Sequence, residues 1–558
     1  MFSFKKKYTR NREIDPDEIF LDSSNLPDFD VHQFEGRIEK PITKNTVRFV
    51  WIFFLLVQAL FIFRVGMLQV VQGDVFVARS ENNRLQNTPI FSERGIIYDR
   101  NGVELAWNSP GEKEFFSRSY TAARGLAHVL GYVGYPAVDR RGFYYQDEFS
   151  GKEGIEKFYD SALNGKNGLK IIETNALLEV QSESVIKLPE NGENLTLTVD
   201  SVLQSKLFEL LASLSAERGF VGGAGVLMDV DNGEILALAS FPEYDPSVLS
   251  EGKDIMAIGG YRIDERKPFL NRAVSGVYTP GSIVKPFVAL GALSEGVITP
   301  DQKILSTGSI EIANPYFPDL KSVFVDWKAH GWVDMRDALA VSSNVYFYEV
   351  GGGFEKQKGI GILNIKKYAQ LFGLGEPTGI DLSGEAKGVI PDPQWKSEMF
   401  DGEPWRVGDT YNTAIGQYGF QVTPLQMARA VAAIANGGVL VPPHVLQERA
   451  GDLVQIDGID ARDLDVVIDG MRRGVVSGTA SGLNVSFVRV AAKTGTAEVG
   501  VSKKLVHSWI VGFFPYEKPK FSFAVVMEKG PSENVIGALF VMRQLLEWMA
   551  VERPEYLE

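Results

Sequence analysis

A serine followed three residues later by a lysine is the first place in this chain where neighbouring side chains could activate a nucleophile. Ser282 and Lys285 follow a Pro-Gly turn and open an apolar stretch that predicts a helix. Residues three apart share a helix face, so the Ser282 hydroxyl and the Lys285 amine are expected within hydrogen-bonding reach. The positive end of the helix dipole favours a serine alkoxide, and a desolvated lysine with a lowered pKa can accept the serine's proton. The pattern predicts a nucleophile that needs no histidine, although Ser-x-x-Lys is also common as a surface helix cap.

A second polar cluster, Ser342-Ser343-Asn344, lies between two apolar runs further along the chain. On a loop beside a cleft, Ser342 can relay a proton and Asn344 can hold an amide of an acyl donor. By itself the cluster is equally compatible with a buried turn.

A third cluster, Lys-Thr-Gly-Thr, closes an apolar strand near the C-terminus. Lys493 would supply positive charge that keeps Lys285 neutral and attracts an anionic substrate. The hydroxyls of Thr494 and Thr496 would bind a terminal carboxylate. Gly495 has no side chain, so a substrate could pair with the strand edge there as an added strand. By itself this cluster also fits a frayed strand end.

The order Ser-x-x-Lys, Ser-x-Asn, Lys-Thr-Gly matches the signature of penicillin-recognising serine enzymes. The backbone N–H groups of Ser282 and Thr496 would then form an oxyanion hole, in which each donor contributes roughly 3 kcal/mol. We assign catalysis to Ser282, Lys285, Ser342, Asn344 and Lys493, and substrate binding to Ser282, Asn344, Thr494, Gly495 and Thr496.

An apolar segment near the N-terminus is expected to anchor the chain in a membrane. Residues 49–71, in which Arg64 is the single charged residue, can cross about 30 Å of hydrocarbon as a helix. The basic residues before the segment predict that residues 1–48 are a cytoplasmic tail and that everything after the segment is extracytoplasmic. No small-residue cleavage site follows, which favours an uncleaved anchor over a signal peptide. A buried amphipathic helix is the alternative.

Composition narrows the class of protein further. The chain has 558 residues, of which 45% are hydrophobic and 23% charged, and this predicts more than one globular domain. A net charge of −14 argues against a nucleic-acid partner. The chain has no cysteine and its five histidines form no metal-binding cluster, so we expect no cofactor and no metal.

Hydrophobic patterns predict an α+β fold. Residues 72–192 are turn-rich and predict a β-rich pedestal domain, with a hairpin at Asn101-Gly102. In residues 193–558 strands are expected at both ends and helices between them, which predicts one sheet assembled from distant segments. The expected elements are a strand at 194–200, a helix at about 202–218, a hairpin at 224–240, helices across 284–435, further strands after 488, and a last helix at about 537–551.

From the anchor to the last helix, the chain resembles class B penicillin-binding proteins, which are monofunctional peptidoglycan D,D-transpeptidases. Besides the three motifs, the resemblance includes residues 94–102, Gly154-Ile-Glu156 and residues 416–427. Within the class the chain is most similar to the elongation type, penicillin-binding protein 2, through Asp326-Trp-Lys328 and Gly408-Asp-Thr410. The division type is the alternative.

The resemblance implies a transpeptidase domain of the penicillin-binding and serine β-lactamase type on a pedestal. It implies cross-linking of stem peptides that end in D-Ala-D-Ala during cell-wall elongation and cell-shape maintenance, and covalent inhibition by β-lactams. It also implies partnership with a membrane glycan polymerase and cell-shape proteins, and a single-pass location in the inner membrane. Rival interpretations are a membrane-anchored D,D-carboxypeptidase or β-lactamase, a β-lactam sensor, and a catalytically silent scaffold.

The chain departs from the family pattern in two places. Family members usually have a glycine where Tyr418 stands. Some elongation-type members carry a zinc near the active site, bound by Asp, His and Cys ligands. Asp326 and His330 lie in the matching stretch, but without a cysteine we expect no zinc here.

Overall fold

The computed structural model describes residues 43–77, 85–111, 114–140, 144–174, 180–313, 317, 319–449, 451–500 and 502–558. The chain divides into two compact units, residues 1–86 with 173–181, and residues 87–172 with 182–558. In the first unit, helix α1 (Lys44–Gly66) continues into the π-helix η4 (Met67–Val71). Together they are long and apolar enough to cross a membrane. The helix begins where the Thr43 hydroxyl accepts the Thr46 N–H, and the expected tail lies almost wholly outside the described residues.

Short strands and helices follow, and the hairpin expected at Asn101-Gly102 is confirmed. Strands β2 (Ile97–Tyr98) and β3 (Glu104–Ser109) pair antiparallel, and Gly102 adopts the positive φ of +81° that the turn requires. With β4 (Ser117–Tyr120) and β11 (Leu195–Thr196) they form a four-stranded sheet. The remaining elements of this region are β1 (Leu85–Ile90), β9 (Gly168–Thr174) and β10 (Val180–Lys187) in one sheet, the pairs β5 (Val133–Gly134) with β8 (Ser150–Gly151) and β6 (Ala137–Val138) with β7 (Tyr144–Gln146), and helices α3 (Ala127–Leu130), α4 (Gly154–Phe158) and α5 (Asp160–Asn164).

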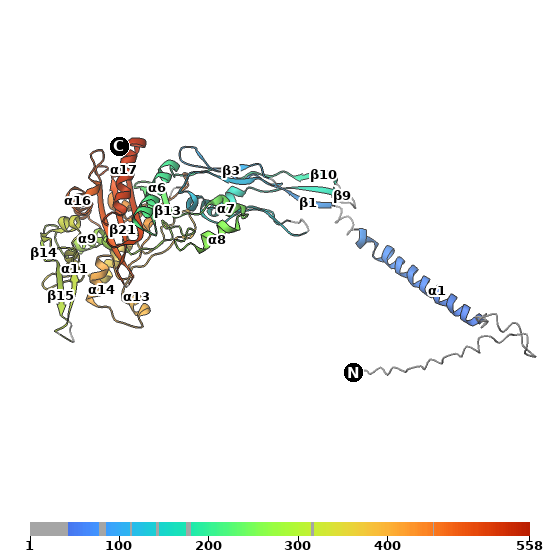
Figure 1. The fold of residues 1–558 in the computed structure, drawn as a ribbon, viewed down its shortest axis with the longest axis horizontal. Coiled ribbons are helices and arrows are strands. Elements are labelled where there is room, and N and C mark those ends of the chain that lie inside the picture. The colour runs from blue at the N-terminus through green and yellow to red at the C-terminus, as the bar shows by residue number, and fades with distance from the viewer. Residues whose placement is uncertain are drawn as a thin grey trace, which may run out of the picture. The chain divides into compact units, whose positions relative to one another are not determined.

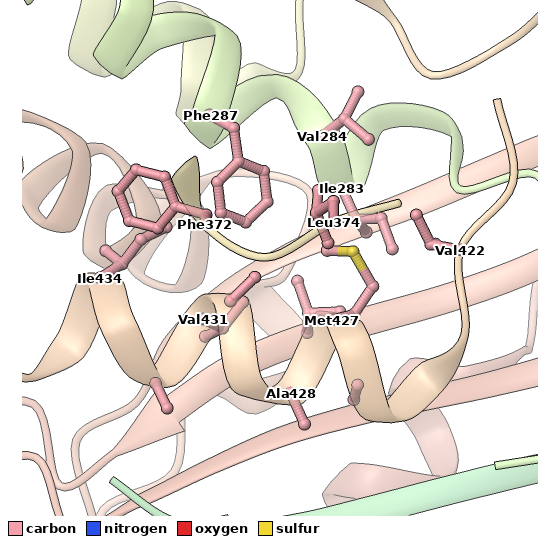
Figure 2. Packing of buried hydrophobic residues seen from close by; sticks show 14 of the residues in the cluster. Ile283, Val284, Phe287, Phe372, Leu374, Val422, Met427, Ala428, Val431 and Ile434 are labelled. Carbon is pink, nitrogen blue, oxygen red and sulfur yellow. The ribbon is translucent and has the colours of Figure 1, made fainter. Parts of the chain in front are cut away.

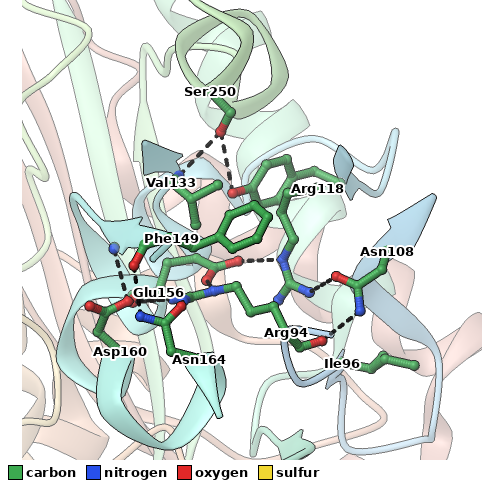
Figure 3. A network of polar contacts seen from close by, with 12 residues as sticks. Arg94, Ile96, Asn108, Arg118, Val133, Phe149, Glu156, Asp160, Asn164 and Ser250 are labelled. Atoms are coloured by element: carbon green, nitrogen blue, oxygen red, sulfur yellow. Dashed lines mark hydrogen bonds and ion pairs between the residues drawn. The ribbon is translucent and has the colours of Figure 1, made fainter. Parts of the chain in front are cut away.

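A buried ion triad joins these small elements (Figure 3). The Glu156 carboxylate accepts the Nε–H of Arg94 at 2.6 Å and the Nε–H of Arg118 at 2.7 Å, and all three side chains are fully buried. Burial alone would raise the pKa of Glu156, but the guanidinium groups of Arg118 and Arg94 hold this pKa below its usual range. Charge pairing thus connects β4 and α4 to the segment before β2.

The main sheet has five antiparallel strands in the order β13-β12-β22-β21-β20. The hairpin expected at 224–240 is confirmed as β12 (Gly222–Asp229) and β13 (Ile235–Phe241), and the other strands are β20 (Ala491–Val499), β21 (Leu505–Phe514) and β22 (Phe521–Pro531). The sheet therefore combines segments some 260 residues apart in sequence, as the α+β prediction required. The strand expected at 194–200 is wrong in extent and place, because only Leu195 and Thr196 are strand residues and they pair in parallel with β2 in the other sheet.

Both faces of the main sheet are buried, because successive side chains on a strand point to opposite faces. Val226 and Val511 belong to one hydrophobic cluster, with the helices α9 (Lys285–Ser294) and α15 (Pro424–Ala435). Their neighbours Leu227 and Ile510 belong to a second cluster, with α6 (Ser201–Arg218) and α17 (Ala538–Glu552). Figure 1 shows α6 and α17 together beside the strands of this sheet. The sheet is the central layer of a three-layer domain.

Helices fill most of residues 284–435, but the structure also places four short strands there, which the sequence interpretation missed. Strand β15 (Ser309–Ala313) pairs with β16 (Lys321–Val325), and β14 (Ile304–Ser306) pairs with β17 (Gly331–Val333). The other elements of this unit are α7 (Pro246–Glu251), α8 (Ile255–Ile263), η5 (Gly281–Val284), α10 (Met335–Val341), α11 (Asn344–Gly352), α12 (Ile362–Leu371), α13 (Pro393–Met399), α14 (Val407–Ala414), β18 (Val439–Leu440), β19 (Val454–Gln455), α16 (Ala461–Ser477), η6 (Ser481–Leu483) and η7 (Pro554–Tyr556).

Helix α9 lies at the centre of this domain and is buried nearly all round. Ile283, just before α9, and Phe287 of α9 lie on the side facing α15, which carries Met427 and Val431 (Figure 2). The Phe287 ring also packs on the Phe372 ring, with centroids 5.3 Å apart. A helix packed this tightly is a rigid support for side chains at its N-terminal end.

Candidate active site

The serine of the first motif lies in a 3₁₀ turn, η5, that leads directly into α9. Ser282 is partly exposed, whereas Lys285, the first residue of α9, is completely buried. The Lys285 backbone N–H donates to the Ser282 carbonyl, but among the described residues no hydrogen bond joins the Ser282 hydroxyl to the Lys285 amine. The expected direct contact is absent because carbonyl and amide oxygens of the second motif take the donors of the Lys285 amine.

Backbone contacts with two other segments hold the nucleophile turn. The Gly281 N–H donates to the Gly416 carbonyl at 2.9 Å. Tyr278 and Val422 exchange two backbone hydrogen bonds, at 2.9 and 3.0 Å. The Trp509 indole N–H donates to the carbonyl of Thr279 at 3.0 Å. The turn is thereby fixed to the sheet on one side and to residues 416–422 on the other.

The second motif connects two helices, α10 and α11, and is not an open loop. Ser342 ends α10 in the left-handed region, with φ +58°, and Asn344 begins α11. The Lys285 Nζ atom donates to the Ser342 carbonyl and to Asn344 Oδ1, both at 2.8 Å, and lies 3.3 Å from Ser342 Oγ. The junction between the two helices therefore places the side chains of Ser342 and Asn344 next to the buried Lys285 amine.

The third motif occupies the middle of β20, whereas the sequence interpretation placed it at a strand's end. The Lys493 Nζ atom donates to Ser342 Oγ at 2.8 Å and to the Thr494 carbonyl at 2.9 Å. Within the described part of the chain, β20 pairs with β21 alone and forms one edge of the sheet. The Ser342 hydroxyl therefore lies between two lysine amines, and all three motifs meet there.

Burial controls the protonation of both lysines. Loss of solvent lowers the pKa of Lys285 to about 7, although the Asp326 carboxylate acts to raise it. The pKa of Lys493 is lowered well below its usual value by burial and by the neighbouring Lys285 amine. Two charged amines sharing one hydroxyl would repel each other, so near neutral pH at least one of them is deprotonated and able to accept a proton.

The structure gives a further reason for a glycine at position 495. A Cβ atom there would lie 2.8 Å from the Pro280 carbonyl oxygen and 2.8 Å from the Ile283 side chain. The absence of a side chain therefore lets β20 approach the nucleophile turn. Thr494 and Thr496 point to the strand's other face, where Thr496 is exposed and the Thr494 hydroxyl donates to Thr479 Oγ1 at 2.6 Å. Thr479 was not identified from the sequence.

Asp326 is a second residue of the site to which the sequence motifs gave no role. Its carboxylate is completely buried beneath the second motif. It accepts the Ser343 hydroxyl at 2.8 Å, the Val345 N–H at 3.0 Å and the Ser306 hydroxyl at 3.3 Å. Because Ser343 caps α11 and Val345 lies in its first turn, the carboxylate fixes the start of that helix. A buried carboxylate with several donors is visible only after folding, since its donors come from distant segments.

The groups around Asp326 do not fit the zinc site of some relatives. They comprise one carboxylate, the His330 imidazole at 3.7 Å, and the hydroxyls of Ser306 and Ser343. Structural and catalytic zinc takes at least three Cys, His or carboxylate ligands. Across the described part of the chain, no three His, Cys, Asp or Glu side chains are grouped to hold a metal ion. We derive no step through a metal.

The fold and the three motifs are those of a serine acyltransferase of the penicillin-binding class. Residues 223–545 match the penicillin binding protein transpeptidase domain, and residues 112–197 match the penicillin-binding protein dimerisation domain. The chain belongs to the penicillin-binding protein transpeptidase family.

Comparison with individual proteins shows which members of the family this chain is similar to. The chain is 30% identical to the peptidoglycan D,D-transpeptidase MrdA of Acinetobacter baumannii, over 84% of this chain and 82% of that protein. Its structure is similar to Pseudomonas aeruginosa PBP2 in complex with WCK 5153, with a TM-score of 0.69, 31% identity, and coverage of 84% of this chain and 100% of the other. PBP2 in its complex with MreC from Helicobacter pylori gives a TM-score of 0.70, 28% identity, and coverage of 84% and 99%.

Proposed function

We propose that this chain is a peptidoglycan D,D-transpeptidase of the elongation type. The observation that carries the proposal is the meeting of three distant motifs at the Ser342 hydroxyl, between the amines of Lys285 and Lys493 and next to the turn that bears Ser282. The similarity to MrdA and to PBP2 structures supplies the substrate class and the elongation role.

In the acylation step, the Ser282 Oγ atom attacks the carbonyl carbon of the penultimate D-Ala of a donor stem peptide. Neutral Lys285 accepts the hydroxyl proton. The tetrahedral oxyanion is stabilised by the N–H groups of Ser282 and Thr496. When the C–N bond breaks, the proton passes through Ser342 to the departing amine, and D-Ala leaves. The product is an ester of Ser282.

In the second step, an amine of a neighbouring stem peptide attacks this ester. Its proton returns through the same amines and the Ser282 hydroxyl is restored, leaving an amide cross-link. Asn344 holds an amide of the donor, and the hydroxyls of Thr494 and Thr496 bind its terminal carboxylate. The donor backbone pairs along the free edge of β20, next to Gly495. A β-lactam would acylate Ser282 in the same way.

For the rest of the chain we propose a cytoplasmic tail (1–48), an inner-membrane anchor (49–71), a pedestal (72–192) and an extracytoplasmic transpeptidase domain (193–558). The helix Lys44–Val71 and the basic residues before it support this orientation. Cell-shape proteins and a membrane glycan polymerase are the proposed partners, and the structural similarity to PBP2 in its complex with MreC supports the first of these.

The experiment uses the full chain with a membrane-linked glycan substrate whose stem peptides end in D-Ala-D-Ala, polymerised beforehand. Dimeric muropeptides are expected with the wild type and not with Ser282→Ala. Monomeric products shortened by one D-Ala, with no dimers, would favour a D,D-carboxypeptidase instead. Rapid turnover of penicillin, without a lasting adduct, would favour a β-lactamase.

A further inference from the structure

Tyr418 adopts a backbone conformation that is unusual for its residue type. Its φ is +59°, in the left-handed region, and the following Gly419 has φ +80°. For a residue with a side chain, this region is strained. Something in the surrounding structure must therefore hold Tyr418 in place.

Residues 416–422, the segment that contains Tyr418, pack in close backbone contact with the nucleophile turn. The Gly281 N–H donates to the Gly416 carbonyl at 2.9 Å, and a Cβ atom on Gly416 would lie 2.1 Å from the Gly281 carbonyl oxygen. At its other end the segment is bonded to Tyr278 through Val422. A shift of Tyr418 is thus transmitted to the residue next to Ser282.

The Tyr418 side chain is held by three aromatic rings from the region of α13 and α14. Its ring centroid lies 5.8 Å from that of Trp395 and 5.8 Å from that of Trp405, both edge to face. Phe400 stacks on it at 6.2 Å with an interplanar angle of 9°. Trp395 also packs against Gly419, where a Cβ atom would lie 2.3 Å from the indole. The rings fix both the side chain and the backbone that follows it.

A buried ion pair supports these rings. The Lys396 Nζ atom lies 5.8 Å from the Tyr418 ring centroid and 2.7 Å from Asp409 Oδ2. The Lys396 side chain is 4% exposed, and Asp409 also accepts the Arg406 N–H at the start of α14. The pair joins α13 to α14, so the cluster around Tyr418 behaves as one body.

We propose that Tyr418 is a positioning residue for Ser282. Its ring transmits the location of α13 and α14 through Gly416 and Gly281 to the nucleophile turn, and so sets the height of the Ser282 hydroxyl relative to the lysine amines. The inference rests on the proposed acylation of Ser282, and it adds to the three motifs a fourth segment that acts without touching substrate.

The test measures acylation of the detergent-solubilised full chain by benzylpenicillin. Titration gives the active fraction, and the dependence of the rate on concentration separates the acylation rate constant from the dissociation constant of the non-covalent complex. Tyr418→Ala and Tyr418→Gly are both expected to lower the rate constant about 10- to 100-fold in the active fraction, because small misplacements of a nucleophile have effects of that size. The dissociation constant should stay unchanged, and Tyr418→Phe, which keeps the ring, should keep the rate.

Tyr516→Ala is the matched control, since Tyr516 is also half-buried and packs on Arg472 and Arg489, and none of its ring contacts or hydrogen bonds among the described residues involves the nucleophile turn. Its acylation rate constant should equal that of the wild type. If Tyr418→Ala does not fold, Phe400→Ala removes the stacked ring from a partly exposed position and should give a smaller decrease of the same constant.

A wild-type rate constant in Tyr418→Ala, or in Phe400→Ala, would overturn the inference, and so would an equal loss in Tyr516→Ala. A wild-type rate in Tyr418→Gly with a slow Tyr418→Ala would show that backbone strain, and not the ring, is responsible, which also overturns it. Failure of the wild type to be acylated would instead overturn the proposed function itself.

Discussion

At the scale of single residues, the chemistry depends on two lysines that burial keeps from being fully charged. Lys285 and Lys493 both reach the Ser342 hydroxyl, at 3.3 and 2.8 Å. A lysine in water would be protonated at neutral pH and could not accept a proton. In this site the packed surroundings exclude water from the amines. Their charged form is thereby destabilised, so a neutral amine is present that can act as a base.

The acylation rate should therefore follow the deprotonation of Lys285. With a pKa of about 7, roughly a tenth of the Lys285 amine is neutral at pH 6 and most of it at pH 8. The second-order rate constant for acylation by benzylpenicillin should rise about tenfold from pH 6 to a plateau above pH 8. A rate independent of pH over this range would contradict Lys285 as the base, as would normal acylation of Lys285→Ala.

Replacing Asp326 should move this pH profile in a defined direction. The Asp326 carboxylate raises the pKa of Lys285, so Asp326→Asn, which removes the charge and keeps the size, should lower that pKa. The rising limb should shift to lower pH, while the plateau falls because an amide oxygen binds the donors at the start of α11 less strongly than a carboxylate does. Measuring the full profile of the variant checks both effects. A rising limb shifted to higher pH would contradict the claim that the Asp326 charge raises the pKa of Lys285.

At the scale of elements, the site depends on the close approach of β20 to the nucleophile turn. Gly495→Ala would place a methyl group 2.8 Å from the Pro280 carbonyl oxygen, too close for van der Waals contact. The strand must move away, so we expect acylation to slow by at least about tenfold.

Gly259→Ala is the control for this substitution. Gly259 lies in α8 with no atom near the position of an added Cβ, so the variant should acylate at the wild-type rate. Equal rates in Gly495→Ala and the wild type would mean that the close approach is not needed for catalysis.

The sequence predicted the elements better than it predicted their connections. The hairpin at 224–240, the helix after residue 200 and the last helix follow from local hydrophobic periods and turn residues, and the structure confirms them. The strand at 194–200 was wrong because its alternating pattern does not specify a partner strand. The small strands around residues 304–333 carry too few residues to show a period.

The same distinction holds inside the site. The residues of the three motifs could be named from the sequence because residue type and spacing were enough. The contacts of Asp326, Thr479 and Tyr418 could not, because each depends on segments that meet only in the folded chain. The close approach of Gly495 to the nucleophile turn was not foreseen either, since the direction of its missing side chain depends on the strand's face.

At the scale of the second compact unit, residues of the proposed pedestal and of the proposed transpeptidase domain share one hydrophobic core. Ile97 and Leu105 belong to the same cluster as Ile283 and Phe287. The Tyr159 hydroxyl also donates to Asp381 at 2.8 Å, and Asp381 accepts the Val445 N–H at 2.8 Å. We expect these two parts to unfold together.

Breaking the buried triad should therefore destabilise the acylating domain. Glu156→Gln leaves the buried Arg118 guanidinium without a carboxylate and leaves Arg94 with only the partly exposed Asp160, which costs about 3–5 kcal/mol. Denaturant unfolding followed by tryptophan fluorescence and by penicillin acylation should shift to lower midpoints in parallel. Glu190→Gln, which removes an exposed pair with Lys166, should leave both midpoints unchanged. Separate shifts of the two signals would contradict a shared core.

The most direct test of the whole account is mass spectrometry of the benzylpenicillin adduct, with peptide mapping of the modified residue. Because the lactam ring opens onto the serine, the wild-type chain should gain the mass of one intact benzylpenicillin, located at Ser282, and Ser282→Ala should gain none. An adduct on a different residue, or an equal adduct on the Ser282→Ala chain, would contradict the account.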